Sequence, residues 1–563
     1  MLNKSNRIIC GAILVGILTT SIVGCSNKSS TAPLPATKTD ISPITFTAFS
    51  SNSSVKVKWG EDPVSKEITK KTGVTLDINY SSGGDGNAKI NVMSASGSLP
   101  DIIFSIDNSA VSKLITAKQL VPLDNYIDKD GTNIKKVFGN QINRMKYAQD
   151  GKTYGFNKGW NSMPFNPPGQ INIQLAVLKD AGYPKITTLD EVYNLIKNYK
   201  AKYPKINGKD TIGVESWGDS YGWSTTIGNT ALRTAGYHDD GDYIVDPTTL
   251  QAKLGLTSDP SKAYFQWLNK LYNENLLDKE SFIQKSDSFN AKVTSGRVLV
   301  TTDAYWDLGG SETALRKAGM PERAYAKLPI YTTAEAAAKS RIMEYDPSGT
   351  FKTVITTTCK NSERAFKFFD EMWSSDMQTL VNWGIKDVNY TVDANGKKAL
   401  KEDVIKLHTD DKDFGSKTGI QLYDNWSVGA GVKDAVGNYI NPWDTPEMQA
   451  ATYTAEDKEC LKAYKSDALT WSDLAPKATQ SPYGFAWTLT LPSDSAGALA
   501  EQKIDSQTRI KQVPKAVMSK NSTDFETSWA ELVKMCNDAG ISSRETEVTN
   551  GLKERVKLWG TSK

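Results

Sequence analysis

The chain of 563 residues is long enough for two large domains or three to four ordinary ones. Its 39% hydrophobic and 23% charged residues are typical of a globular protein. The net charge is +3, and loss of Lys4 and Arg7 with the N-terminal segment would reduce it to +1. This near-neutral balance gives no reason to expect nucleic acid or an acidic membrane surface as a partner.

The first 24 residues have the architecture of a secretory signal. A short basic start precedes the apolar run Ile8–Val23, which is short for a membrane-spanning helix, and Gly24-Cys25 follows. The tetrapeptide Ile22-Val23-Gly24-Cys25 resembles a lipobox, in which the cysteine carries the lipid. A plain signal peptide or membrane anchor with a chance cysteine is the alternative. Residues 25–40 are rich in Ser, Thr and Pro, which predicts a tether that holds the body outside the cell, at the cell membrane.

Cysteines and histidines are scarce in the rest of the chain. Three cysteines remain at long spacings, Cys359, Cys460 and Cys536, so no disulfide framework is expected and each is predicted to pack as a small apolar residue. The two histidines are His238 and His408. A zinc site of the usual ligand type and a histidine-dependent catalytic triad are therefore not expected.

The folded body is predicted to begin with a strand, a helix and a strand. Ile44, Phe46 and Ala48 alternate as in a strand, Asp62-Pro63 supplies a helix start, and residues 74–80 alternate again. This order predicts a βαβ unit. Gly83 to Gly86 form a glycine-rich turn without the Lys-Ser/Thr ending of a phosphate loop, so nucleotide binding is not expected.

A second strand–helix unit lies between Leu99 and Ile127. The apolar run 102–104 has no polar alternation, which is typical of a short strand buried on both faces. Asp107 and Asn108 follow it, at the carboxyl edge of the predicted sheet where ligands tend to bind. They are candidate ligand contacts, and a purely structural role as helix caps is the alternative.

A Gly-, Pro- and Asn-rich passage at 151–168, which contains Trp160, is predicted to cross into a second domain. Behind it, Thr188 and Glu191 form a capping box for a helix with an apolar face. The segment 205–210 offers Asn207 and Asp210 as its side-chain oxygen donors. We therefore expect no calcium there, because calcium prefers six to eight oxygens.

The window 215–223 holds three aromatic residues, Trp217, Tyr221 and Trp223, with neither helical nor strand periodicity. It is predicted to be an ordered loop. Trp267, in contrast, lies on the apolar face of a helix that opens at Asp259-Pro260 and is expected in the core. The acidic run 239–242 is predicted to be a turn before a strand.

A further buried strand is predicted at Val298–Val300, with Asp303, Tyr305 and Trp306 at its end. We interpret it as the return of the chain to the first domain. Residues 362–384 are predicted to form one long helix that Gly384 stops. The last third carries aromatic loops, among them one with Trp443, and ends in a helix whose Trp529 is expected in the core.

Several phrases of the sequence resemble one family. They are PDIIFSIDNSAVSKLITAKQLVPLDNYI, WGIKDVNYT and DFETSWAELVKMCNDAGI, together with the lipobox. They resemble the large family 1 extracellular solute-binding lipoproteins of carbohydrate ABC importers in Gram-positive bacteria. The resemblance implies an α/β fold of the periplasmic-binding-protein type, type II and cluster D-like, with two discontinuous lobes and a cleft between them that closes on ligand.

From the resemblance and the strand pattern we expect lobe 1 to comprise 41–160 and about 296–360. Lobe 2 is expected to comprise 161–295 and about 361–563. The resemblance implies a carbohydrate ligand, ABC permease subunits as partners, a lipid anchor at Cys25 and a monomeric protein without a cofactor. No nucleic-acid partner and no catalytic residues are expected.

Sugars fit the chemistry of the strand-end loops, because a pyranose face stacks on an aromatic ring and its hydroxyls need polar partners. The predicted ligand contacts are Asp107, Asn108, Trp160, Trp217, Tyr221, Trp223, Asp303, Tyr305, Trp306 and Trp443. The alternative is a secreted glycoside hydrolase or polysaccharide lyase. Such an enzyme needs two facing carboxylates, which a sequence with 64 acidic residues can always supply.

Overall fold

The computed structural model describes most of the body of the chain. The described residues are 40–52, 57–82, 86–147, 149–157, 171–218, 223–340, 342–343, 352–411, 413–426, 428, 431–467, 469, 474, 478–479, 481–489 and 491–560. The predicted signal at 1–24 and the predicted tether at 25–40, except for its last residue, lie outside this set, and so does Cys25. None of the helices in the described ranges combines the length and apolar character needed to span a membrane.

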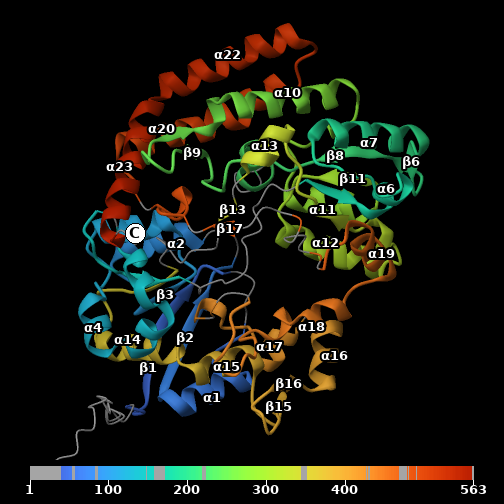
Figure 1. Cartoon of the computed structure of the whole chain (residues 1–563). Coiled ribbons are helices and arrows are strands. Elements are labelled where there is room, and N and C mark those ends of the chain that lie inside the picture. The colour runs from blue at the N-terminus through green and yellow to red at the C-terminus, as the bar shows by residue number, and fades with distance from the viewer. Residues whose placement is uncertain are drawn as a thin grey trace, which may run out of the picture. The chain divides into compact units, whose positions relative to one another are not determined.

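Two buried clusters of apolar side chains divide the body into two lobes. The first lobe is built from described residues of 41–157 and 352–444, and the second from described residues of 171–340 and 455–559. Each lobe packs helices around its own sheet (Figure 1). The two sheets therefore supply two separate edges at which polar residues gather.

The sheet of the first lobe has five strands. Their order is β2 (Val74–Tyr80), β1 (Ile44–Ser50), β3 (Ile102–Phe104), β14 (Thr353–Ile355) and β4 (Gly155–Phe156). β1 pairs in parallel with β2 and β3, as the predicted βαβ unit requires, and β14 is antiparallel to both β3 and β4. The carboxyl ends of β1, β2 and β3 thus share one edge with the start of β14, which we call the first edge.

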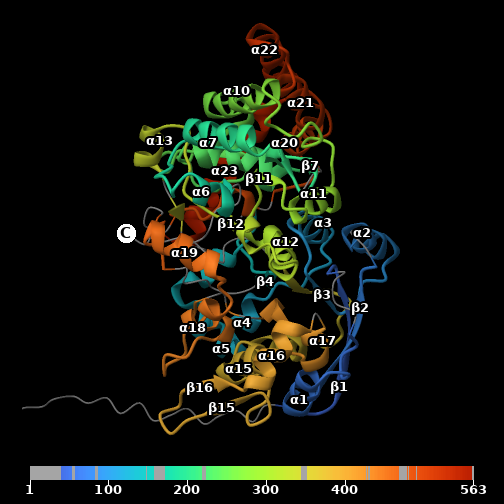
Figure 2. The same cartoon turned by 90° about the vertical axis from the view of Figure 1, so that its right-hand side faces the viewer.

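Helices from two distant parts of the sequence cover this sheet. They are α1 (Pro63–Thr72), α2 (Gly86–Ser96), α3 (Asn108–Thr116), α4 (Asp124–Asp130), α5 (Thr132–Phe138), the 3₁₀ helix η1 (Gly139–Met145), α14 (Ser362–Met372), α15 (Ser375–Trp383), α16 (Glu402–Asp410) and α17 (Phe414–Thr418). Figure 2 shows α15 and α17 beside α1, although more than 300 residues separate them. The Asp62 side chain caps α1 by accepting the Ser65 N–H at 2.8 Å, as predicted.

The expected single helix at 362–384 is two helices. The Ser374 side chain accepts the backbone N–H of Met377, which starts α15 two residues after α14 has ended. A serine that caps in this way competes with the continuous helical backbone, and the apolar periodicity on both sides conceals the break. Both helices pack in the first lobe, so their expected place in lobe 2 is wrong.

The sheet of the second lobe has four strands, in the order β12 (Tyr325–Ala326), β5 (Asn172–Gln174), β11 (Val298–Thr301) and β8 (Ile212–Glu215). β11 is parallel to β8, with Val300 opposite Val214, and antiparallel to β5. The expected return of the chain to the first lobe at 298–300 is therefore wrong. That return is made by β14.

The helices of the second lobe come from its two sequence segments. They are α6 (Leu175–Asp180), α7 (Leu189–Lys202), α9 (Asn229–Thr234), α10 (Asp259–Asn273), α11 (Ser286–Thr294), α12 (Tyr305–Lys317), α13 (Ala334–Lys339), α19 (Ala455–Tyr464), α20 (Ala496–Lys503), the π-helix η9 (Ile504–Gln512), α21 (Val513–Val517), α22 (Ser522–Ala539) and α23 (Ile541–Trp559). The predicted capping box of Thr188 and Glu191 is present at the start of α7. Trp267 and Trp529 are buried in this core, as expected.

The crossovers between the lobes connect their polar edges. β4 ends at Phe156, beside Thr353 at the first edge, and β5 begins at Asn172, opposite Thr301 at the end of β11. We call the carboxyl ends of β8 and β11, with the start of β5, the second edge. When the chain returns to the first lobe, β12 ends near the second edge and β14 begins at the first edge. These two crossovers thus leave one edge and enter the other, whereas a third, between η6 (Pro442–Asp444) and α19, joins helices.

Candidate functional site

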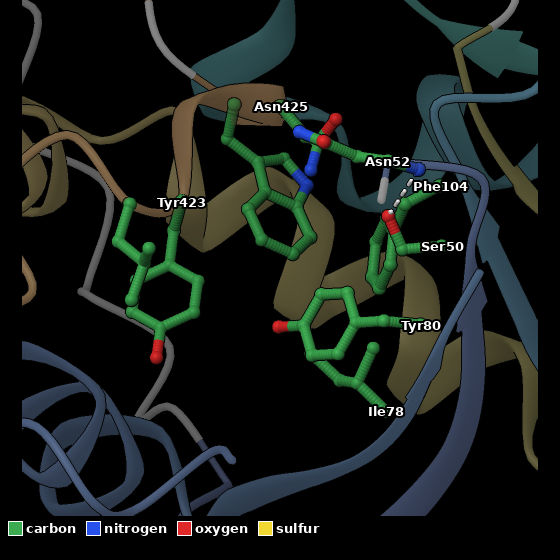
Figure 3. Close-up of a pocket in the computed structure, with 9 residues that line it drawn as sticks. Ser50, Asn52, Ile78, Tyr80, Phe104, Tyr423 and Asn425 are labelled. Carbon is green, nitrogen blue, oxygen red and sulfur yellow. Dashed lines mark hydrogen bonds between the residues drawn. The ribbon is translucent and has the colours of Figure 1, made fainter. Parts of the chain in front are cut away.

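The first edge contains a small pocket. Its walls come from the ends of β1, β2 and β3 and from a segment of the last third of the chain. The lining residues are Ser50, Asn52, Ile78, Tyr80, Phe104, Leu422, Tyr423, Asn425 and Trp426. Figure 3 shows Tyr80 reaching from β2 toward the Tyr423–Asn425 segment. The pocket therefore combines aromatic rings with hydroxyl and amide groups.

The segment 422–426 is fixed above the strand ends by specific contacts. The Tyr423 hydroxyl donates to the Asp62 carboxylate, which also caps α1. The Trp426 ring, 2% exposed, lies edge-on to Phe104 with ring centroids 5.1 Å apart. At the rim, the Ser105 hydroxyl donates to the Asn425 side-chain oxygen at 3.1 Å. These contacts hold the pocket in shape without a ligand.

Tyr80 presents a hydrogen-bonding group to this pocket. Burial, reinforced by the Asp62 carboxylate, raises the pKa of the Tyr80 phenol to about 12. The phenol is therefore protonated at neutral pH, so that it can donate to an acceptor in the pocket while its ring offers an apolar face.

At the second edge the polar groups that end β8 and β11 bond to one another. The Ser216 and Thr302 hydroxyls lie 2.6 Å apart, and the Trp217 indole N–H donates to the Asp303 carboxylate at 3.0 Å. The Asn172 amide, at the start of β5, donates to the Asp303 backbone carbonyl at 2.7 Å. Trp217 and Asp303 are 4% and 1% exposed, so they shape this edge from beneath rather than covering a ligand.

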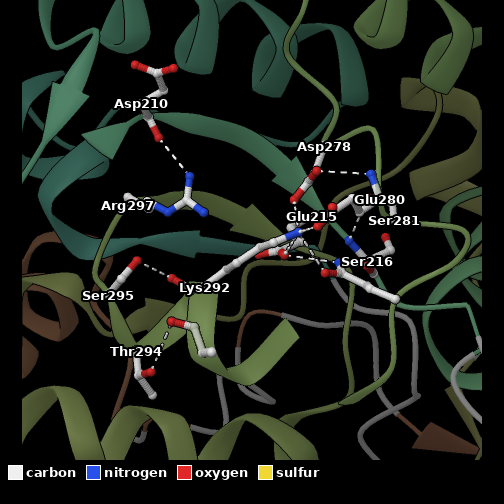
Figure 4. Close-up of polar contacts among 12 residues, drawn as sticks. Asp210, Glu215, Ser216, Asp278, Glu280, Ser281, Lys292, Thr294, Ser295 and Arg297 are labelled. Atoms are coloured by element: carbon white, nitrogen blue, oxygen red, sulfur yellow. Dashed lines mark hydrogen bonds and ion pairs between the residues drawn. The ribbon is translucent and has the colours of Figure 1, made fainter. Parts of the chain in front are cut away.

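A charge cluster lies directly behind Ser216, at the end of β8. Figure 4 shows Lys292 extending from α11 toward Glu215, with Asp278 and Glu280 around its ammonium group. The N–O distances are 2.7 Å to Asp278 and 2.6 Å to Glu280, but 3.6 Å to Glu215. Because Lys292 is shared among three carboxyl groups, it offsets the burial of Glu215 incompletely. Burial accordingly raises the pKa of Glu215 to about 8.

These buried carboxyl groups predict a pH dependence of stability. Burial, followed by the charge of Asp307, raises the pKa of Asp303 to about 7, so both Asp303 and Glu215 bind protons more tightly in the folded chain. Between about pH 4 and pH 8 the unfolded chain loses these protons first, and the free energy of unfolding falls as pH rises. We expect the melting temperature of Glu215→Gln/Asp303→Asn to fall less over this range than that of the parent.

Calorimetry of both proteins at several pH values checks this expectation. The comparison is made as the difference between parent and variant, because other carboxyl groups titrate in the opposite sense. Glu363, for example, has a pKa lowered to about 2 by its hydrogen bonds to Lys367 and Lys129. A difference between the two melting temperatures that stays constant from pH 4 to pH 8 would show that neither buried carboxyl carries the effect.

A larger pocket is lined from both lobes. The first lobe contributes Asn108, Ser109 and Lys113 of α3, and the second lobe contributes residues of 489–510 and Arg544. The lobes touch here, since the Asn108 amide donates to the Thr488 carbonyl at 3.4 Å and the Ser112 hydroxyl to the Leu491 carbonyl at 2.9 Å. Asn108 is therefore placed where the lobes meet.

The remaining predicted contacts fall into four groups. Asp107 caps α3, accepting the Ala110 N–H at 2.8 Å and a bond from Asn87. Trp223 is packed in the second core, and Trp443 stacks on His408 with ring centroids 3.6 Å apart, so packing accounts for both rings. Tyr305 and Trp306 begin α12 at the second edge. Trp160 and Tyr221 lie outside the described residues, and their predicted contacts stay predictions.

The sequence analysis missed Tyr80, Asn425, Trp426 and Lys352 as residues of the first edge. Tyr80 ends a strand that was recognised, so its position at a strand end was a usable signal. Asn425 and Trp426 reach the edge through long-range contacts, Asn425 with Ser105 and Trp426 with Phe104 and Phe368. No local pattern near 420–426 indicates these contacts.

The segment 205–210, where no calcium is expected, is a hairpin, with β6 (Lys205–Ile206) paired to β7 (Lys209–Asp210). Asn207 and Gly208 both have positive φ, of 51° and 76°, as a tight two-residue turn requires. The Asn207 amide donates to the Ser295 carbonyl at 3.2 Å. Within the described ranges, no three His, Cys, Asp or Glu residues come together as a metal site.

The comparisons with known proteins agree on one protein family. The model of the bacterial extracellular solute-binding protein family matches residues 52–379. Lipoprotein LipO of Bacillus subtilis is 26% identical over 61% of this chain and 68% of its own length. The polygalacturonan/rhamnogalacturonan-binding protein YtcQ of the same species is 25% identical over 63% of this chain and 70% of its own.

Solved structures share the fold. The substrate-binding protein FusA of Streptococcus pneumoniae, solved in complex with kestose, superposes with a TM-score of 0.63 at 18% identity. The match covers 92% of this chain and 99% of that one. Nearly the whole two-lobed architecture is therefore shared, and the α/β two-lobed fold that the resemblance implied is confirmed.

Proposed function

This chain belongs to the bacterial extracellular solute-binding proteins, and on that basis we propose that it captures an oligosaccharide outside the cell. It delivers this cargo to the membrane permease of an ABC importer. The single observation that carries the carbohydrate assignment is the pocket at the first edge. There the Tyr80 ring and hydroxyl, the Asn52 and Asn425 amides and the Ser50 hydroxyl line one space.

This combination suits a sugar better than a peptide or an ion. A sugar ring has an apolar C–H face that packs on an aromatic ring, and hydroxyl groups that both donate and accept hydrogen bonds. Asn52 and Asn425 each offer a carbonyl oxygen and an NH₂ group, and Tyr80 adds a phenol. A sugar hydroxyl can therefore either donate or accept a hydrogen bond in this pocket.

The proposed mechanism is closure of the two lobes on the cargo. The chain passes between the first edge and the second at two of its crossovers, so a small rotation about these connections brings the edges toward each other. A ligand that contacts both edges at once favours the closed arrangement by the contacts that exist only there. The permease then recognises the closed lobes.

The proposal also includes the location of the protein and its oligomeric state. Cleavage before Cys25 and lipidation of its thiol, with palmitate among the acyl groups, would anchor the protein at the extracellular face of the membrane. Residues 25–40 would act as the tether, and the protein would work as a monomer. No catalytic step is part of the proposal: the cargo leaves the protein chemically unchanged.

The relatives support a carbohydrate cargo but differ in its chemistry. YtcQ is named for polygalacturonan and rhamnogalacturonan, while FusA is named for fructooligosaccharides. The names therefore leave open whether the cargo of this chain carries carboxylates.

The test is to titrate the mature, lipid-free protein with a panel of plant and bacterial oligosaccharides. Intrinsic tryptophan fluorescence and the melting temperature report binding, and mass spectrometry after a day of incubation reports the state of the sugar. The proposal expects a spectral change and a raised melting temperature with the sugar recovered intact. A shortened or unsaturated sugar would identify an enzyme instead.

A further inference from the structure

The pocket at the first edge and the larger pocket lie at the two ends of one short loop. Phe104, at the end of β3, lines the first of them, and Asn108, at the start of α3, lines the second. A chain spans at most about 3.6 Å per residue, so the Cα atoms of these two residues lie within about 14 Å of each other. The loop between them begins at Ser105, whose hydroxyl donates to Asn425 at the rim of the first pocket. The two pockets are therefore neighbours.

We propose that the oligosaccharide cargo fills both pockets, with one sugar unit in the pocket at the first edge and a further unit in the larger pocket between α3 and η9. This inference rests on the proposed function and makes it more specific. It assigns to the cargo a length of at least two linked units, and it names residues of both lobes that bind the same ligand.

Arg544 presents hydrogen-bond donors to the larger pocket from the second lobe. Its Nε–H donates to the Tyr243 hydroxyl at 2.9 Å, and Nε lies 3.3 Å from the Glu501 carboxylate. The Tyr243 hydroxyl in turn donates to Glu501 at 3.0 Å. Within the described ranges, the two terminal amino groups of Arg544 form no hydrogen bond. The guanidinium group is therefore held through one nitrogen, and its other donors are available to a ligand.

A second arginine fixes this arrangement from behind. Arg509 is 5% exposed and lies 3.2 Å from the Glu501 carboxylate and 2.8 Å from the Asp242 carboxylate. Removing one member of such a buried cluster would leave a charge without its partner, so the cluster is expected to persist without a ligand. The donors of Arg544 are thus positioned before the sugar arrives, which lowers the cost of binding.

Other residues of the larger pocket also suit a sugar unit. Gln502 and Ser506 are exposed and add an amide and a hydroxyl from the second lobe, and Ser109 adds a hydroxyl from the first. Ile510, at the end of η9, is 48% exposed and offers an aliphatic surface. A sugar unit there covers this apolar surface with its C–H face and exchanges hydrogen bonds to water for hydrogen bonds to the protein.

The wall from the first lobe is one face of α3. Ser109 and Lys113 are four residues apart on this helix and therefore lie on the same face, and both line the larger pocket. The Ser112 hydroxyl, which donates to the Leu491 carbonyl at 2.9 Å, holds α3 against the second lobe. A sugar unit that bonds to Lys113 and Arg544 at once contacts both lobes. It favours the lobe arrangement in which both side chains are within its reach.

A length series of one sugar tests the inference directly. The tightest-binding sugar of the panel is compared with shorter and longer members of its series by isothermal titration calorimetry. We expect affinity to rise about tenfold or more when a second unit enters the larger pocket, and to level off once both pockets are filled. Affinity that does not rise with length overturns the inference and leaves the proposed function intact. Failure of every sugar to bind counts against the proposed function itself.

Gln502→Ala tests the wall from the second lobe. The residue is exposed, and its side chain makes no hydrogen bond within the described chain, so the variant should fold. Affinity for a long member of the series is expected to fall about fivefold, and affinity for the shortest member that binds is expected to change little. Gln507→Ala is the matched control, because Gln507 is exposed on η9 and does not line the pocket. It should bind every member as the parent does.

Lys113→Met tests the wall from the first lobe and removes the donors of an exposed side chain. We expect about a tenfold loss of affinity for the long member, the effect of losing a charge-assisted hydrogen bond. Lys136→Met, at an exposed lysine of α5, is the control and should leave affinity unchanged.

Arg544→Lys keeps a positive charge beside Glu501 but removes the planar fork of donors. Affinity for the long member is expected to fall about tenfold, and the melting temperature reports whether the variant is folded. Unchanged affinity for the long member in the Gln502, Lys113 and Arg544 variants overturns the inference. An equal loss for every length also overturns it, because the shortest sugar would then already lie in the larger pocket.

Discussion

Replacing Trp426 by alanine is expected to lower the free energy of unfolding by about 3–5 kcal/mol, as for other buried aromatic residues. The indole is almost completely buried and packs edge-on against Phe104 and Phe368, with centroids 5.1 and 5.5 Å away. Its removal leaves a cavity beneath the first edge and frees the segment 422–426. Differential scanning calorimetry should record a drop of about 10 °C in the transition that includes the first lobe.

Trp487→Ala is the matched control, because Trp487 is 43% exposed. We expect it to change the melting temperature by no more than a few degrees. A variant at Trp426 that melts like the control would mean that the last third of the chain does not close the first lobe, and the description of the pocket would have to be abandoned.

Replacing Tyr80 by alanine is expected to weaken oligosaccharide binding by about 10- to 100-fold, since both ring stacking and a hydrogen bond are lost. Tyr80→Phe keeps the ring and is expected to lose about tenfold or less. The hydroxyl makes no hydrogen bond within the described chain, so Tyr80→Phe should leave the melting temperature of the ligand-free protein nearly unaffected. Isothermal titration calorimetry measures the affinities.

The exposed Tyr237 provides the control for this series. Tyr237→Ala should bind the sugar as the parent does. If Tyr80→Ala also binds like the parent, the pocket at the ends of β1, β2 and β3 is not where the sugar ring lies.

Local features of the sequence predicted the local features of the fold. The alternation at 74–80, the cap at Asp62 and the capping box at Thr188 each depend on neighbours within a few residues, and each appears in the structure. The strand at 298–300 was also recognised, but its sheet was not. Both sheets contain short apolar strands that are followed by polar residues. Only the pairing between strands far apart in the sequence shows to which sheet a strand belongs.

For the candidate site, too, local features could be predicted and long-range contacts could not. The sequence predicts Asp303 at the end of a strand, but it does not predict that Trp217 lies beside it, because it assigns the two residues to different lobes, whereas β8 and β11 pair in one sheet. The burial of both residues is not predicted either, because it depends on Phe289 packing against the Trp217 ring, with centroids 6.3 Å apart, and on other contacts made elsewhere. Similarly, nothing around Asn425 shows that it will lie against Ser105, 320 residues earlier.

Hydrogen–deuterium exchange with the tightest-binding sugar of the panel tests directly whether the sugar is held between the two lobes. Capture between the lobes predicts slower exchange, on adding sugar, in two separated groups of peptides. One group covers residues 50–52, 80–82 and 422–426 of the first edge, and the other covers 215–218 and 301–304 of the second. Slower exchange at one edge alone, or at neither, would contradict capture of the sugar between the two lobes.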